Sequence, residues 1–449
     1  MLSAFISSLR TADLRRKILF TIGLVVLYRV GASLPSPGVN FQNVQKCIGE
    51  AQGSGSAQVY SLINLFSGGA LLQLSVLAVG VMPYITASII VQLLVVVIPR
   101  FEQLQKEGQS GQAKMTQYTR YLAVALAVLQ GTSIVAMAAS GNLLQGCTLN
   151  ILQDQSIFSL VVIVLVMTAG AALVMWMGEL VTERGIGNGM SLIISLGILS
   201  QLPTAVGMII QQLNLDSQEP GQMTFASVLL LAFVFVVVTI STILVIQGNR
   251  RIPLQHARRM VGRKEVQGGS SFIPLKVNYA GVIPVIFASS LLMFPATLAT
   301  FVGTGNWIGM AANWIATSGA YTAFYVGLII FFTYFWTATQ FHPDQIASDM
   351  KKNGAFIPGI RQGRPTQEFL ESTMNRVTLL GAVFLAAIAI LPQIVQRLLG
   401  VSQTISYFFG GTALLILVGV VLDTMKQVES HLLTKRYDGF MKKGRISGR

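Results

Sequence analysis

Long apolar runs alternate with shorter polar gaps along the whole chain, and there are ten such runs. Most reach the roughly 20 residues that a helix needs to cross about 30 Å of hydrocarbon. The pattern therefore predicts an all-α membrane protein with ten transmembrane helices. They are expected at residues 18–34, 76–98, 121–139, 157–178, 190–210, 225–247, 280–300, 321–341, 377–396 and 405–422.

The basic residues give these helices an orientation. All but three of the 31 Lys and Arg residues lie before the first run, after the last run or in every second gap. The exceptions are Arg29 inside the first run and Lys46 and Arg397 in the remaining gaps. Because basic residues in short loops stay on the cytoplasmic side, the amino and carboxyl termini are both predicted to be cytoplasmic.

Composition excludes other classes of protein. The chain is 53% hydrophobic and 11% charged, whereas soluble domains carry about 25% charged residues. Its net charge of +14 follows from the topology, and no block has the interleaved aromatic and basic residues of a single-strand binding groove. The histidines match no metal-site spacing, and the runs contain no acidic residue, so we expect no catalytic residue, metal or cofactor.

Three parts outside the runs need separate interpretation. Residues 1–17 alternate apolar and basic positions in helical fashion, which predicts an amphipathic helix on the inner membrane surface or else a frayed terminus. Residues 427–449 form a basic cytoplasmic tail. Cys47 and Cys147 both lie in predicted outside loops, which permits a disulfide, although two unpaired thiols are the preferred interpretation.

The outside segment after the first run becomes apolar again at residues 61–73, which read SLINLFSGGALLQ. A helix of this length would extend only about 20 Å, too short to cross the membrane. Irregular backbone at membrane depth is tolerated where protein or a water-filled cavity surrounds it. We therefore expect a short re-entrant segment inside a funnel, the alternative being an interfacial helix on the outer leaflet.

Five runs precede the middle of the chain and five follow it. An odd number in each half makes the second half start on the opposite side of the membrane, as in an inverted repeat. The halves are expected at residues 18–211 and 225–426. Arg29, the only charge inside a run, either snorkels outward or caps backbone carbonyls between helices, and a structural role is preferred.

Two of the predicted cytoplasmic gaps, residues 248–279 and 342–376, are too long to be simple turns. The first carries seven basic residues and one acidic residue, which suggests a docking surface for RNA, lipid headgroups or an acidic protein face. The sequence RGIGNGMS at residues 184–191 faintly resembles a nucleotide-binding loop. No strand is predicted before it, so its glycines more plausibly permit close approach of helices.

Five segments in order closely resemble the bacterial type of the SecY family, the pore subunits of the Sec protein translocase. They are NLFSGGALLQLSVLAVGVMPYITASIIVQLL (64–94), GELVTERGIGNGMSLII (178–194), PLKVNYAGVIPVIFASS (274–290), GAFIPGIRQGRPT (354–366) and YFFGGTALLI (407–416).

The resemblance implies two inverted five-helix halves around a central hourglass pore. They would be hinged between helices five and six and would open sideways between helices two and three on one side and seven and eight on the other. Residues 61–73 correspond to a plug helix, represented by Leu62, Asn64, Phe66, Ser67, Gly68 and Gly69. The apolar pore ring corresponds to Val81, Ile85, Met190, Ile194, Ile286 and Ile416.

The resemblance also implies a lateral gate and docking sites. The polar gate positions match Thr86, Gln130 and Ser290. The positions where the family docks a ribosome or the SecA motor ATPase match Arg250, Arg251, Arg258, Arg259 and Arg361.

The implied function is a protein-conducting channel in the bacterial plasma membrane, not an enzyme. Such a channel passes unfolded preproteins and releases hydrophobic segments, including signal peptides, into the membrane lipids. SecE and SecG are the implied accompanying subunits. The alternative is a secondary transporter of a small solute, which would need polar ligands at mid-depth, and the runs offer few.

Overall fold

The computed structural model describes residues 12–51, 67–141, 149–213, 224–256, 259–261, 264–266, 270–302, 320–401 and 403–443. The first half of the chain contains α2 (Ala12–Ser33), α3 (Phe41–Ala51), α5 (Met82–Val97), α6 (Pro99–Lys106), α7 (Gln109–Ala139), α8 (Ile157–Arg184), α9 (Gly189–Ser200) and α10 (Leu202–Gln212). The second half contains α11 (Phe225–Gln247), α12 (Ile283–Val302), α14 (Ala320–Gln340), α15 (Pro343–Lys352), α16 (Arg364–Leu399), α17 (Gln403–Phe409) and α18 (Thr412–Lys443).

Each of the ten predicted runs coincides with a helix or with two consecutive helices. Among the described residues, six helices are long and apolar enough to cross a membrane, or seven when the bent pair α5 and α6 counts as one span. That pair bends by 101° at Ile98, which is extended because Pro99 follows it and disfavours the helical conformation of the preceding residue. The chain is a multi-pass membrane protein.

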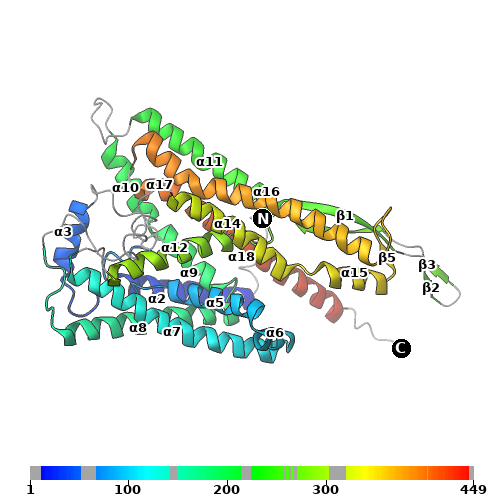
Figure 1. The fold of residues 1–449 in the computed structure, drawn as a ribbon, viewed down its shortest axis with the longest axis horizontal. Coiled ribbons are helices and arrows are strands. Elements are labelled where there is room, and N and C mark those ends of the chain that lie inside the picture. Colours follow the sequence, from blue (N-terminus) through cyan, green and yellow to red (C-terminus); the bar gives the residue numbers. More distant parts are fainter. Residues whose placement is uncertain are drawn as a thin grey trace.

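The long helices run side by side along the longest axis of the molecule (Figure 1). In the first half α7 lies between α5 and α8, and α2 contacts α8. In the second half α14 lies between α12 and α16, and α11 contacts α18. The halves meet in two places, where α12 contacts α5 and α7, and where α9 and α10 contact α18 and α17.

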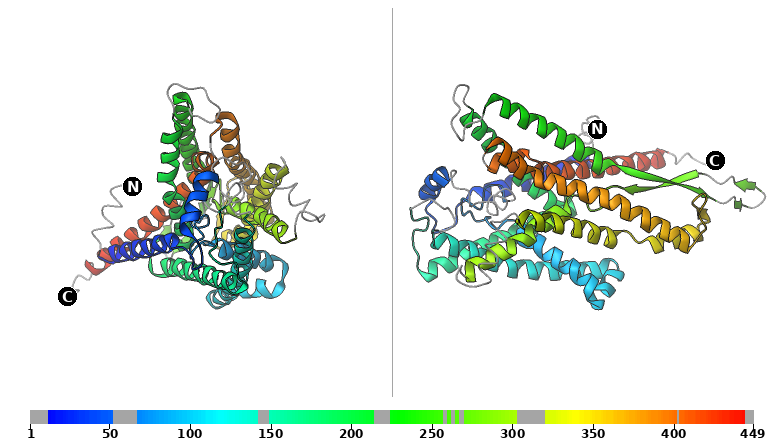
Figure 2. Two further views of the ribbon diagram at one scale, coloured as in Figure 1. Left: turned by 90° about the vertical axis from the view of Figure 1, so that its left-hand side faces the viewer. Right: turned by 45° about the horizontal axis from the view of Figure 1, so that its top comes forward.

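Five strands lie in the two segments predicted to be cytoplasmic, where the sequence indicated only long loops. Strand β1 (Asn249–His256) pairs antiparallel with β4 (Ser270–Lys276) on one side and β5 (Ala355–Phe356) on the other, and β2 (Arg259–Val261) pairs with β3 (Lys264–Val266). They project from one end of the helix bundle (Figures 1 and 2). Ile252 and Leu254 of β1 and Leu275 of β4 belong to one apolar cluster with Leu370 and Met374 of α16, which anchors the three-stranded sheet.

At the opposite end, the segment after α2 pairs with the segment before α8. The Asn40 amide donates to the carbonyl of Ile151 at 2.8 Å, and Val39 bridges Leu152. Cys47, fully buried in α3, is disulfide-bonded. The preferred interpretation of two unpaired thiols is therefore wrong, and Cys147, the other cysteine of the sequence, lies outside the described residues.

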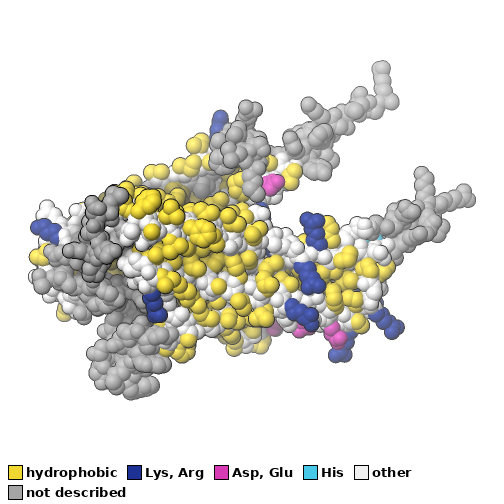
Figure 3. All heavy atoms as spheres, turned by 90° about the horizontal axis from the view of Figure 1, so that it is seen from above, with side chains coloured by type: hydrophobic (Ala, Val, Ile, Leu, Met, Phe, Trp, Pro, Cys, Tyr) yellow, Lys and Arg dark blue, Asp and Glu magenta, His cyan; other side chains and the backbone are white. Residues whose placement is uncertain are grey.

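The surface of the bundle is apolar around its middle. In the face shown in Figure 3, hydrophobic side chains form a broad band, and Lys and Arg gather toward the end that carries the strands. Exposed residues such as Leu27, Phe233 and Leu380, with 62% relative exposure each, would be costly in water. In a bilayer they face hydrocarbon, so this surface fits a membrane-spanning bundle.

Candidate functional site

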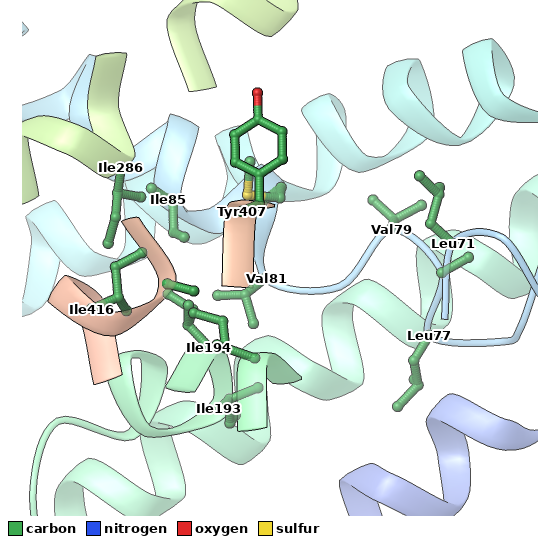
Figure 4. Packing of buried hydrophobic residues seen from close by; sticks show 14 of the residues in the cluster. Leu71, Leu77, Val79, Val81, Ile85, Ile193, Ile194, Ile286, Tyr407 and Ile416 are labelled. Atoms are coloured by element: carbon green, nitrogen blue, oxygen red, sulfur yellow. The ribbon is translucent and has the colours of Figure 1, made fainter. Parts of the chain in front are cut away.

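An apolar cluster fills the middle of the molecule, where four helices from both halves meet. Val81 and Ile85 come from the start of α5, Ile194 from α9, Ile286 from α12 and Ile416 from α18 (Figure 4). Their relative exposures are 8% or less. Met190 is partly buried and packs against the same cluster. The structure thus brings together all six residues that the resemblance assigned to the pore ring.

The start of α9 explains how its two ring residues reach the centre. Asn188 caps the helix, because its Oδ1 accepts hydrogen bonds from the amides of Met190 and Ser191. A Cβ atom at Gly189 would lie 1.9 Å from the carbonyl oxygen of Gly178, so only glycine permits this contact between α8 and α9. The glycines of this loop serve close helix packing, as the sequence suggested, and Met190 and Ile194 then share one face.

The labelled side chains of this cluster are apolar, apart from the hydroxyl of Tyr407. Branched and flexible apolar side chains at a constriction keep out water and ions by dewetting. Within the described part of the chain, no group of three or more His, Cys, Asp or Glu residues could hold a metal ion.

The described part of the re-entrant segment lies next to this cluster. From Ser67 to Val81 the chain passes through consecutive turns before α5 begins. Leu71, Leu74 and Leu77 are exposed by 1% or less and belong to the same apolar cluster as the ring. Ser67 is buried, and Gly68 and Gly69 follow it with positive φ angles. Leu62, Asn64 and Phe66 lie outside the described residues.

The three proposed gate residues lie on helices that meet across the two halves. Thr86 is on α5, Gln130 on α7 and Ser290 on α12, and α12 contacts both other helices. The Thr86 hydroxyl donates to the carbonyl of Met82 and the Ser290 hydroxyl to that of Ile286. Both hydroxyls therefore bond within their own helix, while Gln130 is buried with 9% exposure.

The proposed docking arginines lie at the end that carries the strands. Arg250 and Arg251 are exposed on β1, and the Arg251 guanidinium lies 4.9 Å from the centroid of the Phe272 ring. Arg259 is on β2, and Arg258 lies outside the described residues. Arg361 is exposed in the turn before α16.

An ion pair between α7 and α8 was not predicted from the sequence. Arg120 Nε of α7 lies 2.8 Å from Glu179 Oε1 of α8, and the Glu179 side chain is only 16% exposed. Arg120 directly precedes one predicted run and Glu179 directly follows the next. These opposite charges at the ends of two neighbouring runs were the available signal for such a pair.

Comparisons with known proteins place the chain among its relatives. The family model described as SecY matches residues 75–425. The chain is 60% identical to the protein translocase subunit SecY of Mycobacterium tuberculosis (strain ATCC 25618 / H37Rv) over 452 residues, covering 98% of this chain and 100% of that protein. It is 53% identical to the same subunit of Chlamydia trachomatis over 447 residues, covering 98% of each.

Solved structures share the fold. One, titled "The structure of a protein conducting channel", is similar with a TM-score of 0.57 at 19% identity and covers 92% of this chain and 91% of that one. Another is "Sec61 in the Canine ribosome-channel complex from the endoplasmic reticulum", with a TM-score of 0.55 at 16% identity and the same coverage.

Proposed function

Since the chain belongs to the SecY family, we infer that it is a protein-conducting channel through which unfolded polypeptides cross the membrane. The observation that carries this function is the apolar ring of Val81, Ile85, Met190, Ile194, Ile286 and Ile416, contributed by both halves. A secondary transporter needs polar ligands at that depth. The ring gives a passing chain only apolar surface, which suits cargo of varied sequence.

The seam of α5 and α7 against α12 is the proposed lateral gate. A hydrophobic segment of the cargo would leave the pore between these helices and enter the lipid. Hydrogen bonds between membrane helices average about 0.6 kcal/mol, so a polar residue such as Gln130 gives little resistance to separation. Apolar contacts across the seam can be replaced by contacts with the hydrophobic segment or with lipid.

The strands β1–β5 and the turn at Arg361 form the proposed docking surface. A related channel is described in complex with a ribosome, and a basic, exposed surface at one end of the bundle suits an RNA or acidic protein partner. We place this end in the cytoplasm of a bacterium, with the bundle in its plasma membrane and both termini inside. SecE, SecG and the SecA ATPase are the expected partners.

A transport assay tests the proposal directly. The full chain, co-purified with the subunits that accompany it, is reconstituted into vesicles with the motor ATPase and ATP. A urea-unfolded preprotein should become protected from external protease, and the protection should vanish without ATP. Vesicles that protect no preprotein but accumulate a small solute against its gradient would instead support the transporter.

A further inference from the structure

Arg29 contacts the re-entrant segment rather than pointing away from the protein. Its Nη1 donates to the carbonyl oxygen of Gly68 at 2.9 Å and to the hydroxyl oxygen of Ser200 at 3.0 Å. Arg29 lies on α2 and Ser200 on α9. Of the two interpretations that the sequence left open, the structure thus shows the carbonyl cap. One charged side chain joins three separate parts of the fold.

Other groups hold the same point of the segment. The Tyr28 hydroxyl lies 3.4 Å from the carbonyl oxygen of Ser67, and Ser200 Oγ lies 3.3 Å from that of Gly68. Gly68 has a φ of +67°, and a Cβ atom there would lie 2.9 Å from the Cα of Gly197. The backbone at Ser67 and Gly68 is therefore seated closely against α9, with its carbonyls directed at side-chain donors.

The chain directly after the segment is held in a different way. The amide of Ser36 donates to the carbonyl of Leu74 at 3.0 Å, and the amide of Val76 donates to the carbonyl of Leu34 at 2.9 Å. These backbone bonds tie residues 74–76 to the chain that follows α2. Side-chain donors thus hold the described start of the segment at Ser67 and Gly68, whereas backbone pairing holds the chain that follows it at residues 74–76.

The Arg29 contact is suited to breaking and re-forming. A carbonyl in irregular backbone at membrane depth needs a donor, and a guanidinium provides a strong, charge-assisted one. Arg29 as a whole is exposed and lies one helical turn from the end of α2. After release, its long side chain can reach water at the membrane boundary, so separation leaves no charge stranded in hydrocarbon.

We propose that Arg29 is a positioning residue that latches residues 67–69 against α9, the helix that carries Met190 and Ile194 of the ring, and that this latch is released when the channel opens. The proposal rests on the proposed channel function. It assigns a task to the one charge inside a membrane-spanning run. Ser200 shares the latch by orienting the guanidinium, and Tyr28 supports the neighbouring carbonyl.

The test compares resting ion leak per channel in planar bilayers among four variants of the full complex. Arg29→Met keeps the length of the side chain but removes its donors, and should raise the leak about tenfold or more, the change expected for losing a charged hydrogen bond of ordinary strength. Arg29→Lys keeps the positive charge and an ammonium donor but loses the fork of the guanidinium, and should give an intermediate rise. Ser200→Ala should give a smaller rise. Ser33→Ala, whose hydroxyl bonds only to Val30 of its own helix, should match the parent.

Leak is normalised to the amount of complex, so a variant that merely folds poorly lowers the number of channels without raising the leak of each. If the ion leak per channel of Arg29→Met equals that of the parent, the proposed latch is refuted. If that variant does not accumulate, unchanged leak in both Arg29→Lys and Ser200→Ala overturns it. Preprotein transport by the parent is measured in parallel, because its failure would refute the channel function itself, whereas normal transport with no leak in the variants refutes the latch alone.

Discussion

Replacing Ile194 with Asn is predicted to open the resting channel. Ile194 is 3% exposed in the apolar cluster that contains the ring. A buried amide without partners costs about 1–3 kcal/mol, and the lost apolar burial adds about 1 kcal/mol or more. When the ring opens, the amide meets water or a peptide backbone, so the cost falls mainly on the closed state.

A penalty of about 2–4 kcal/mol on the closed state corresponds to a shift of roughly 30- to 700-fold in the ratio of closed to open channels. The resting ion current per channel in planar bilayers should therefore rise. Preproteins with weakly hydrophobic signal segments should also be exported better, since less binding energy is needed to open the channel. The conservative variant Ile194→Leu should keep the parent current.

Leu199→Asn is the matched control, because Leu199 lies on the same helix but is 43% exposed. The same amide placed there should not affect the seal. A resting current in Ile194→Asn equal to that of the parent, in channels that still transport preprotein, would refute the role of the ring as the seal. An equal increase of the resting current in Ile194→Asn and Leu199→Asn would show that the effect does not depend on the buried position of Ile194.

Three further predictions concern other parts of the molecule. Gly189→Ala should lower the yield of folded protein sharply, because the added Cβ would lie 1.9 Å from a backbone oxygen of α8. Gly207→Ala should be neutral, because no atom lies within 4 Å of the Cβ position there. Thermal unfolding of both variants in detergent measures the effect. Arg361→Glu should block motor-driven export while leaving the protein folded in the membrane, and normal export by this variant would exclude Arg361 from docking. Replacing the three gate residues Thr86, Gln130 and Ser290 by Leu should change how hydrophobic a signal segment must be for export. An unchanged hydrophobicity threshold would exclude a role for the polarity of these side chains.

The helices could be predicted from sequence because the membrane requires long apolar runs, and each run became a helix or a pair of helices. The strands at one end of the bundle were not predicted, for a physical reason. Strand β1 buries only Ile252 and Leu254, and Pro253 between them argues against a strand. The alternation of those two residues was the available signal, but two apolar positions in a basic segment are a weak one.

Less of the candidate site than of the fold could be predicted from the sequence. Apolar periodicity cannot distinguish a pore-lining isoleucine from one that packs two helices, so Ile286 and Ile416 were assigned by resemblance alone. The contact between Arg29, Gly68 and Ser200 joins residues far apart in the sequence, and no local pattern predicts it. The sequence did show that Arg29 is a charged residue within an apolar run, and this indicated that its side chain needs a polar partner.

Crosslinking of a stalled cargo chain tests whether polypeptides pass through the apolar ring. A preprotein is halted midway by a folded domain at its end, and photoreactive residues replace Ile85 or Ile286 in the ring, or Leu199 on the exposed face of α9. We expect covalent capture of the cargo from both ring positions and little from Leu199. Absence of capture at the ring, under conditions in which the parent protects preprotein, would show that polypeptides do not pass through this constriction.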